Sequence, residues 1–372
     1  MNHTKSGLLT PFSIAVAHFS PSPFFGNKGV FNPDLVSSLI DNNSRIKNMK
    51  QLTSVKASSS ESIVFSNKLN ILKYPWHVSH DYELCKLPQN MVLLSNTHRR
   101  WNINNRPVPD NVEFVNTIDA RETDLMILHV DQWTWHELDK RLLFLDYRDR
   151  YKKPKIIINH GCNMVDGCSS EQMKELIGDN FMVCNSSTAH KLWGIENSRF
   201  IRHGMSPEEW PQTNYGRANI IVNQAFSKIH QEYRNNTAIF EFEEKTGIKI
   251  DWIGRDCKFN SFDKYRAFLA TSSILFSPSY ASPNPRARTE AMLCGIVVVT
   301  TNCHGESEYI RNGENGYASN NMNELYEYLE FLSQNPDEVR RVGKNAKKMA
   351  QKVFHIDQFI AQWQEVLSLF RT

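Results

Sequence analysis

Short apolar runs alternate with longer, more polar stretches along most of the chain. The runs are nearly continuous in apolar residues, as strands buried on both faces of a parallel sheet should be. The predicted strands of the first half are residues 12–17, 91–95, 125–130, 155–159 and 181–185, and those of the second half are residues 219–223, 249–253, 273–277 and 296–301. Strands that alternate with helical stretches predict parallel α/β sheets.

A linker divides the two sets of strands. The sequence MSPEEWPQTNYGRAN contains Pro207, Pro211 and Gly216, residue types that interrupt helices and strands. We therefore predict an N-terminal domain over residues 1–205 and a C-terminal domain over residues 206–355. Each is expected to be a doubly wound, Rossmann-like α/β domain, and the two should face each other across a cleft. The length of 372 residues agrees with two domains, because domains average about 150 residues.

The tail, residues 356–372, predicts a packing helix. Apolar side chains recur there at helical spacing and form a broad stripe at Ile356, Phe359, Ile360, Trp363, Val366, Leu367 and Phe370. One surface that this helix could cover is the N-terminal domain. The basic run RRVGKNAKKMAQK precedes it, and a solvated helix face is favoured over a patch for a membrane surface or a polyanion.

Composition and charge narrow the class of protein. Apolar residues make up 40% of the chain, and no apolar run approaches the ~18 residues of a membrane span, so we expect a globular chain that contacts a membrane at most peripherally. The 43 basic and 40 acidic residues nearly balance, unlike those of a dedicated nucleic-acid module. The polar start and the short apolar stretch after it do not resemble a signal peptide, so a cytoplasmic location is expected. Seven cysteines without a CxxC spacing favour reduced thiols.

The segment from Ser277 to Tyr317 carries the clearest chemistry. A predicted strand ends at Ser277, a proline-rich loop carries Arg286 and Arg288, and a helix opens near Glu290. A helix N-terminus beyond the end of a parallel strand presents free N–H groups to an anion, and guanidiniums beside it suit a phosphate. Glu290 has two interpretations: a carboxylate that accepts the vicinal hydroxyls of a ribose, or a helix-end carboxylate that the helix dipole stabilises.

Several motifs in this half of the chain carry a resemblance to a known family. SPSYASPNPRARTEAMLCGIVVVTT and HGESEYIRNGENGY resemble the donor-sugar region of retaining glycosyltransferases of the GT-B fold, family 4 type. VCNSSTAHKLWG, FIRHGMSPEEW and INHGC extend the resemblance to about residues 155–365. It implies two facing Rossmann-like domains and an enzyme that moves a sugar, expected to be a hexose, from a nucleoside diphosphate to an acceptor hydroxyl.

The resemblance also implies site residues. Glu290 would hold the ribose and Arg286 and Arg288 the diphosphate. His160, which ends a predicted strand, would contact the transferred sugar or the acceptor, with a hydrogen-bonded structural histidine as the alternative. Arg286 and His160 are the expected catalytic residues. The pair Gly26 and Gly29 would let the backbone approach the donor closely, and a plain turn is the alternative.

The sequence departs from the family at two places. Ser282 stands eight positions before Glu290, where the first of two donor-site glutamates is expected, so Ser282, Asn284 or backbone groups would take over its role. VNQAFSKIHQEYR lacks the usual arginine after a glycine and offers Lys228 and Arg234 to the donor instead. As an alternative, both cations are solvated helix residues.

The acceptor site and the metal content are further predictions. Arg100 and Trp133 could stack on an acceptor sugar or base, with plain packing as the alternative. No Asp-x-Asp triplet occurs, so protein cations would neutralise the diphosphate, and we expect no metal and no cofactor beside the nucleotide-sugar co-substrate. The two histidines of WHVSH have metal-like spacing, but the sequence places no third ligand near them.

The sequence therefore predicts a nucleotide-sugar-dependent glycosyltransferase with a glycan, lipid-linked or small-molecule acceptor. An alternative within this class acts on modified bases in DNA, which the aromatic and basic residues of the first domain suggest. An alternative outside it is a nucleotide-sugar-binding protein without transferase activity, which Ser282 suggests.

Overall fold

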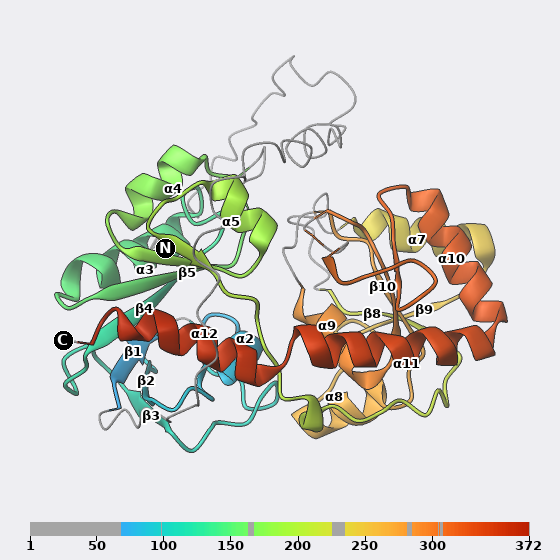
Figure 1. Ribbon diagram of the computed structural model, residues 1–372, viewed down its shortest axis with the longest axis horizontal. Helices are drawn as coiled ribbons and strands as arrows, with labels where there is room; N and C mark the ends of the chain where they lie inside the picture. Colours follow the sequence, from blue (N-terminus) through green and yellow to red (C-terminus); the bar gives the residue numbers. More distant parts are fainter. Residues whose placement is uncertain are drawn as a thin grey trace, which may run out of the picture. The chain divides into compact units, whose positions relative to one another are not determined.

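The chain folds around two parallel β-sheets, each covered by helices on both faces (Figure 1). The computed structural model describes residues 68–97, 99–162, 167–224, 235–280, 285–303, 305 and 308–371. The predicted strand at residues 12–17 and six candidate site residues lie outside this description, namely Gly26, Gly29, Lys228, Arg234, Ser282 and Asn284.

The first sheet has seven strands among the described residues, in the order β3-β2-β1-β4-β5-β6-β7, and all neighbours are parallel. The strands are β1 (Asn70–Lys73), β2 (Asn90–Leu94), β3 (Val112–Val115), β4 (Leu125–Val130), β5 (Lys155–Asn159), β6 (Phe181–Cys184) and β7 (Ser198–Phe200). Successive side chains alternate between two apolar clusters: Leu72 and Met126 lie in one, Ile71 and Leu125 in the other. The sheet is therefore buried on both faces.

Helices from distant parts of the chain cover the first sheet. One face packs against α3 (Leu138–Arg150), α4 (Ser170–Ile177) and α5 (Ser187–Trp193), and the other packs against α2 (Val78–Leu84) and α12 (Ile356–Ser368). Figure 1 shows the red α12 beside these strands, although it follows the second sheet in sequence. We call this sheet with its five helices the first lobe.

The second sheet has five described strands, in the order β12-β11-β10-β8-β9, and is also parallel throughout. Its strands are β8 (Ile220–Val222), β9 (Ile250–Trp252), β10 (Ile274–Ser277), β11 (Val297–Thr300) and β12 (Tyr317–Ala318). The helices α8 (Phe262–Leu269) and α9 (Arg286–Cys294) pack on one face, α7 (Asn236–Thr246) and α10 (Met322–Gln334) on the other, and α11 (Pro336–Val353) contributes to both. This sheet and its helices form the second lobe.

The predicted fold class, two doubly wound domains of parallel strands with a C-terminal helix, is confirmed. Sequence patterns missed four strands, three of which lie at sheet edges: β3, β7 and β12. Edge strands are short or partly exposed, so they lack a continuous apolar run; β3 alternates Val, Glu, Phe and Val with two exposed positions. The interior strand β1 was missed because it has only two apolar residues, Ile71 and Leu72, between Asn70 and Lys73, although Lys73 is fully buried.

Two neighbouring segments connect the lobes. The N–H of Met205 donates to the carbonyl of Phe354 at 2.8 Å, which joins the first connection to the second just before α12 begins. At Gly204 an added Cβ would lie 2.5 Å from the Cβ of Phe359 on α12. A glycine is therefore required where the first connection passes this helix.

Candidate active site

A cavity of about 390 Å³ lies where the second sheet faces a loop of the first lobe. The second lobe contributes Asn223 after β8, five residues of the loop from Ile253 to Phe259 after β9, Tyr265 on α8, and the first turns of α9. The first lobe contributes Ser79 on α2 and four residues of the loop after β2, namely Asn102, Asn104, Asn105 and Arg106. The cavity is therefore at the carboxyl ends of parallel strands, where open α/β sheets bind their ligands.

Helix α9 determines which of its polar side chains face the cavity. It begins at Arg286 directly after Pro285, and it ends before Gly295, whose φ of 81° is the left-handed conformation that glycine adopts easily. Arg286 and Glu290 are four residues apart on one helix face, and both line the cavity. The first helical turns thus present one cation and one anion to the same space.

Arg288 lies on a different side of α9. Because the helix has already begun at Arg286, two residues apart means about 200° around the axis. Arg288 is 2% exposed, and its Nη1 donates to the hydroxyl of Thr300 at the end of β11, 3.1 Å away. It is not among the cavity's lining residues. The structure brings Arg286, but not Arg288, to the candidate site.

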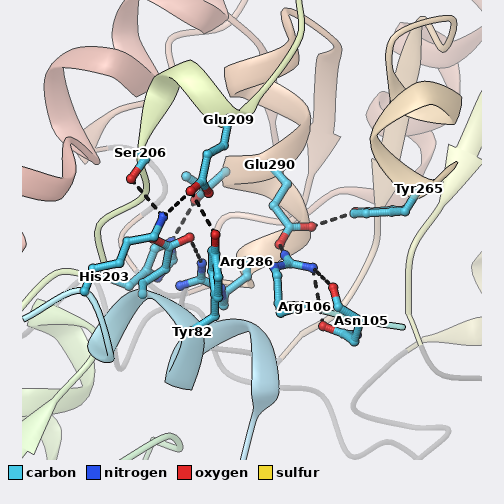
Figure 2. A network of polar contacts seen from close by, with 12 residues as sticks. Tyr82, Asn105, Arg106, His203, Ser206, Glu209, Tyr265, Arg286 and Glu290 are labelled. Atoms are coloured by element: carbon cyan, nitrogen blue, oxygen red, sulfur yellow. Dashed lines mark hydrogen bonds and ion pairs between the residues drawn. The ribbon is translucent and has the colours of Figure 1, made fainter. Parts of the chain in front are cut away.

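Both carboxylate oxygens of Glu290 are engaged, by groups from different lobes (Figure 2). Oε1 accepts from Nη2 of Arg106 at 2.5 Å, and Oε2 accepts from the hydroxyl of Tyr265 at 2.6 Å. The amide of Asn223 donates to the same Tyr265 oxygen at 2.8 Å. Burial, together with the negative charge of Glu290, raises the pKa of Tyr265 well above its usual value. Tyr265 is therefore a neutral donor that holds Glu290 in place.

Arg286 also contacts the first lobe. Its Nη2 is 3.3 Å from Oε1 of Glu83 on α2, a carboxylate whose side chain is 1% exposed. Lys86 lies 2.8 Å from the other oxygen of Glu83 and 2.8 Å from Glu209. Figure 2 shows this second polar contact area beside Arg106 and Glu290, with Tyr82 and Ser206 also in it. Each charged residue of α9 that faces the cavity thus has a partner of opposite charge in the first lobe.

Burial also shifts the pKa values of Glu83 and Arg286. It raises the pKa of Glu83, and the charges of Arg286 and Lys86 act in the opposite direction. It lowers the pKa of Arg286, which the carboxylates of Glu83 and Glu290 partly offset. An anion that replaced Glu83 beside Arg286 would therefore meet a desolvated cation, for which a charge partner is worth more than in water.

His160 lies at the end of β5, but among other aromatic rings rather than on the cavity wall. Its Nε2 is 3.0 Å from Nδ1 of His129, and its Nδ1 is 3.1 Å from the amide nitrogen of Asn185. The rings of Trp76 and His80 also contact it. Burial lowers the pKa of His160 well below its usual value, so it is neutral near pH 7. Both of its ring nitrogens are already occupied by protein groups.

The two predicted acceptor residues, Arg100 and Trp133, do not line the cavity. Arg100 is exposed, and its neighbour Arg99 instead stacks on the ring of Trp76, 3.7 Å from the centroid. Trp133 is half-buried, and its backbone N–H donates to Asp131 at 3.0 Å. Their acceptor roles stay predictions.

Sequence reasoning missed Arg106, Tyr265 and Glu83, which complete the site. Each is brought to α9 from another element, and Arg106 is 184 residues from Glu290. The only local signal was that Arg106 stands directly before a proline, in NNRPVPD. This position predicts an extended backbone but does not identify the residue that Arg106 contacts. Among the described residues, no group of three or more His, Cys, Asp or Glu side chains could hold a metal ion.

Part of the chain matches known proteins in sequence. Residues 245–349, which include Tyr265, Arg286 and Glu290, match the sequence model of the family "Glycosyl transferases group 1". A protein of Haemophilus influenzae described as an uncharacterized glycosyltransferase is 28% identical over 103 residues, a match that spans 27% of this chain and 29% of that protein.

Solved structures match over a larger part of the chain. Anabaena HepE in complex with UDP aligns with a TM-score of 0.60 and 15% identity, over 81% of this chain and 100% of that one. Sucrose-phosphate synthase of Thermosynechococcus elongatus also has a TM-score of 0.60, with 11% identity, over 81% and 99%. A variant of Staphylococcus aureus TarM, in complex with UDP and alpha-GlcNAc-glycerol, has a TM-score of 0.53 with 16% identity, over 67% and 55%.

Taken with the two parallel sheets, these matches show that the fold is GT-B. Residues 245–349 of the second lobe, which contribute Tyr265, Arg286 and Glu290 to the cavity wall, match the glycosyl transferases group 1 family. The prediction of a glycosyltransferase is confirmed over this segment of the chain. No helix of the described part of the chain is both long and apolar enough to cross a membrane.

Proposed function

We propose that this protein is a glycosyltransferase that moves a sugar from a nucleoside diphosphate to an acceptor hydroxyl, with retention and without a metal ion. The observation that carries the proposal is the cavity beyond β8 and β9, where Glu290 and Arg286 project from one face of α9. Most of the second-lobe wall of this cavity lies within the segment that matches the group 1 family, and a neighbour of the same fold has been crystallised with UDP.

The donor nucleotide would lie along the second lobe. Glu290 would accept the two ribose hydroxyls, because a carboxylate offers two adjacent oxygens at the spacing of a vicinal diol. The apolar walls supplied by Ile253 and Phe259 suit the faces of a planar base. Between them, Gly254 has a φ of 92° and open space at its Cβ position, which leaves room for the base.

Arg286 would neutralise the diphosphate. As the bond from the sugar to the phosphate breaks, negative charge grows on the leaving oxygen and positive character grows at the anomeric carbon. A buried guanidinium with a fixed position stabilises that growing charge without reorganisation, which is the work that a metal does in transferases with an acidic triplet. The α9 N-terminus adds its free N–H groups to the same end of the cavity.

The acceptor would bind at the first lobe. We propose a glycan, a lipid-linked glycan or a small molecule, with a cytoplasmic protein that contacts a membrane at most peripherally. Because both ring nitrogens of His160 are engaged by Asn185 and His129, a contact from His160 to sugar requires that one of these bonds be exchanged. Arg100 and Trp133 remain the candidates for stacking on the acceptor.

The proposal is tested by donor hydrolysis and transfer. The purified protein would be incubated with UDP-glucose, UDP-N-acetylglucosamine, GDP-mannose and ADP-glucose, each with a panel of sugar acceptors and in the presence of EDTA. Release of the nucleoside diphosphate that persists in EDTA is expected, and the anomeric configuration of the product should match that of the donor. Activity that EDTA abolishes and manganese restores would contradict the metal-free mechanism.

A second candidate, a nucleotide-sugar-binding protein without transfer, is favoured by Ser282 at the position of the family's first donor-site glutamate. Binding of a nucleotide sugar without hydrolysis or transfer for any acceptor would favour this candidate.

A further inference from the structure

We infer that the Arg106 side chain blocks the donor site, and that its ion pair with Glu290 must break before the ribose of a nucleotide can bind there. We call this side chain the latch. The inference rests on the proposed function, because it needs Glu290 to be the ribose carboxylate. It adds a residue of the first lobe, outside the group 1 domain, that sets the affinity of the second lobe for its donor.

The loop that carries Arg106 is attached to the first lobe. The indole N–H of Trp101 donates to the carbonyl of Arg106 at 2.9 Å, and the N–H of Arg106 itself returns to the carbonyl of Asn102 at 3.2 Å. Pro107 follows directly and restricts the backbone. Arg106 therefore moves with the first lobe rather than as a free surface side chain.

Arg106 is held deep in the contact between the lobes. It is 2% exposed, and its guanidinium lies 4.2 Å from the ring centroid of Phe262 and 5.6 Å from that of Trp210, both from the other side of the contact. Nη2 donates to Glu290, and Nη1 donates to the carbonyl of Asn105 at 2.7 Å. The charge of Glu290 is thus balanced inside the protein by a cation that also lines the cavity.

The ribose and Arg106 need the same carboxylate oxygen. A vicinal diol uses both oxygens of a carboxylate, and here Oε2 is bonded to Tyr265 and Oε1 to Arg106. The Tyr265 hydroxyl can stay, because a carboxylate oxygen accepts more than one hydrogen bond. Oε1 could also accept a second bond, but Glu290 is only 4% exposed and the guanidinium on Oε1 is packed against two aromatic rings. We therefore infer that a ribose hydroxyl reaches this oxygen only after Arg106 withdraws.

This arrangement lowers the apparent donor affinity. If only a fraction of molecules has Arg106 withdrawn, the apparent dissociation constant equals the intrinsic constant divided by that fraction. Because the latch belongs to the first lobe, movement of that lobe away from α9 would expose Glu290, and donor binding would in turn favour the withdrawn state. Access to the donor site is then coupled to the position of the acceptor lobe.

The test compares UDP affinity, by calorimetric titration, in the parent and in Arg106→Met. Methionine keeps an unbranched stem against Phe262 and Trp210 but removes the charge. The latch predicts at least fivefold tighter UDP binding in Arg106→Met, and a smaller gain in Arg106→Lys, which retains a charge without the planar fork. The matched control is Arg121→Met, which removes an exposed ion pair with Glu113 within the first lobe and should leave UDP affinity unchanged.

A double-mutant cycle makes the result specific to Glu290. In a Glu290→Gln background, Arg106→Met should no longer tighten UDP binding, because the latch has lost its charged partner. Unchanged or weaker binding in Arg106→Met would overturn the latch while leaving the proposed function intact, provided that the parent binds UDP. Binding of UDP by Arg106→Met but not by the parent would support the latch. If neither the parent nor Arg106→Met binds UDP, GDP or ADP, both the latch and the proposed function are overturned.

Discussion

The donor cavity and the histidine cluster of the first lobe handle buried polar groups in opposite ways. At the cavity, full charges are paired across the two lobes, Arg106 with Glu290 and Arg286 with Glu83. In the histidine cluster, which consists of His80, His129 and His160 beside Trp76, burial lowers the pKa values of the rings and keeps them neutral.

The difference indicates in which region a ligand can replace contacts within the protein. Ion pairs between lobes can be replaced by a charged ligand that brings its own partners for both sides. The histidine cluster instead lies beside an ion pair within one lobe, between Lys73 at the end of β1 and Asp81 on α2, and Nε2 of His129 is 3.9 Å from Asp81. Because the Lys73–Asp81 pair lies within one lobe and does not line the cavity, we expect it to serve the fold and the cavity pairs to serve binding.

The largest effect is expected from Asp81→Ala in the first lobe. Asp81 binds Lys73 and accepts the backbone N–H of Trp76 at 2.7 Å, so its loss leaves a buried ammonium without its partner. Removing one partner of a buried pair costs about 3–5 kcal/mol. Urea unfolding of the variant and of the parent measures this directly.

The matched control is Asp146→Ala, which removes an exposed pair with Arg150 on α3. Such pairs contribute about 0–1 kcal/mol. Equal losses in Asp81→Ala and Asp146→Ala would show that the Lys73 pair has no special structural role.

A pH titration of stability is expected to give the next largest effect. Burial lowers the pKa values of His80, His129 and His203 well below 6.5, so below that pH the unfolded chain binds protons that the folded chain does not. The free energy of unfolding is therefore unaffected by these histidines above about pH 6.5. Below that pH it falls by up to about 1.4 kcal/mol per pH unit for each histidine. Glu83 acts in the opposite direction, because its pKa is raised.

The measurement is the free energy of unfolding between pH 7.5 and 5.0. His80→Leu should reduce the slope by about one proton, since neither ring nitrogen of His80 has a hydrogen-bond partner among the described residues. The exposed His136, changed to Gln, should leave the slope as it is. A slope that His80→Leu does not alter would mean that this ring titrates as it does in water.

A smaller and more selective effect is expected from lysine at the two arginines of α9. Arg286→Lys keeps the charge but loses the bidentate fork, and should lower turnover by about tenfold to a hundredfold, the equivalent of about 1.5–3 kcal/mol. Donor binding should weaken less, because the phosphate charge grows towards the transition state. Arg288→Lys should reduce stability through its bond to Thr300 instead, with little change in turnover. The reverse pattern would assign the diphosphate to Arg288.

The sequence predicted the two sheets well because their central strands are continuous apolar runs. β4, β5 and β11 carry this signal, and β3 and β7 do not, since an edge strand need not bury both faces. The sequence also identified α9 as the element that bears the candidate site. It placed Arg286 and Arg288 together in the loop before the helix, whereas α9 already begins at Arg286 and turns Arg288 away from the cavity.

Contacts between the lobes were beyond sequence reasoning. Arg106 meets Glu290 and Glu83 meets Arg286 only through the packing of the whole chain, and one chain without its relatives carries no pairing signal for residues 184 or 203 positions apart. The environment of His160 was likewise hidden, because its neighbours Asn185 and His129 come from separate segments of the chain.

The central claim, that Glu290 holds a nucleotide sugar at the cavity, is tested most directly by calorimetric titration of UDP-glucose and GDP-mannose into the parent and Glu290→Gln. Glutamine keeps the shape of the side chain and removes its charge, and the exposed Glu314, changed to Gln, is the control within the same lobe. The account predicts that Glu290→Gln weakens the preferred donor by about 1–3 kcal/mol, while Glu314→Gln binds as the parent does. Because Glu290→Gln also releases Arg106, the same comparison is made in an Arg106→Met background, where that release cannot offset a lost ribose bond. Equal affinity in Arg106→Met and in the double variant that adds Glu290→Gln to it would contradict the assignment and leave Glu290 as a structural partner of Arg106.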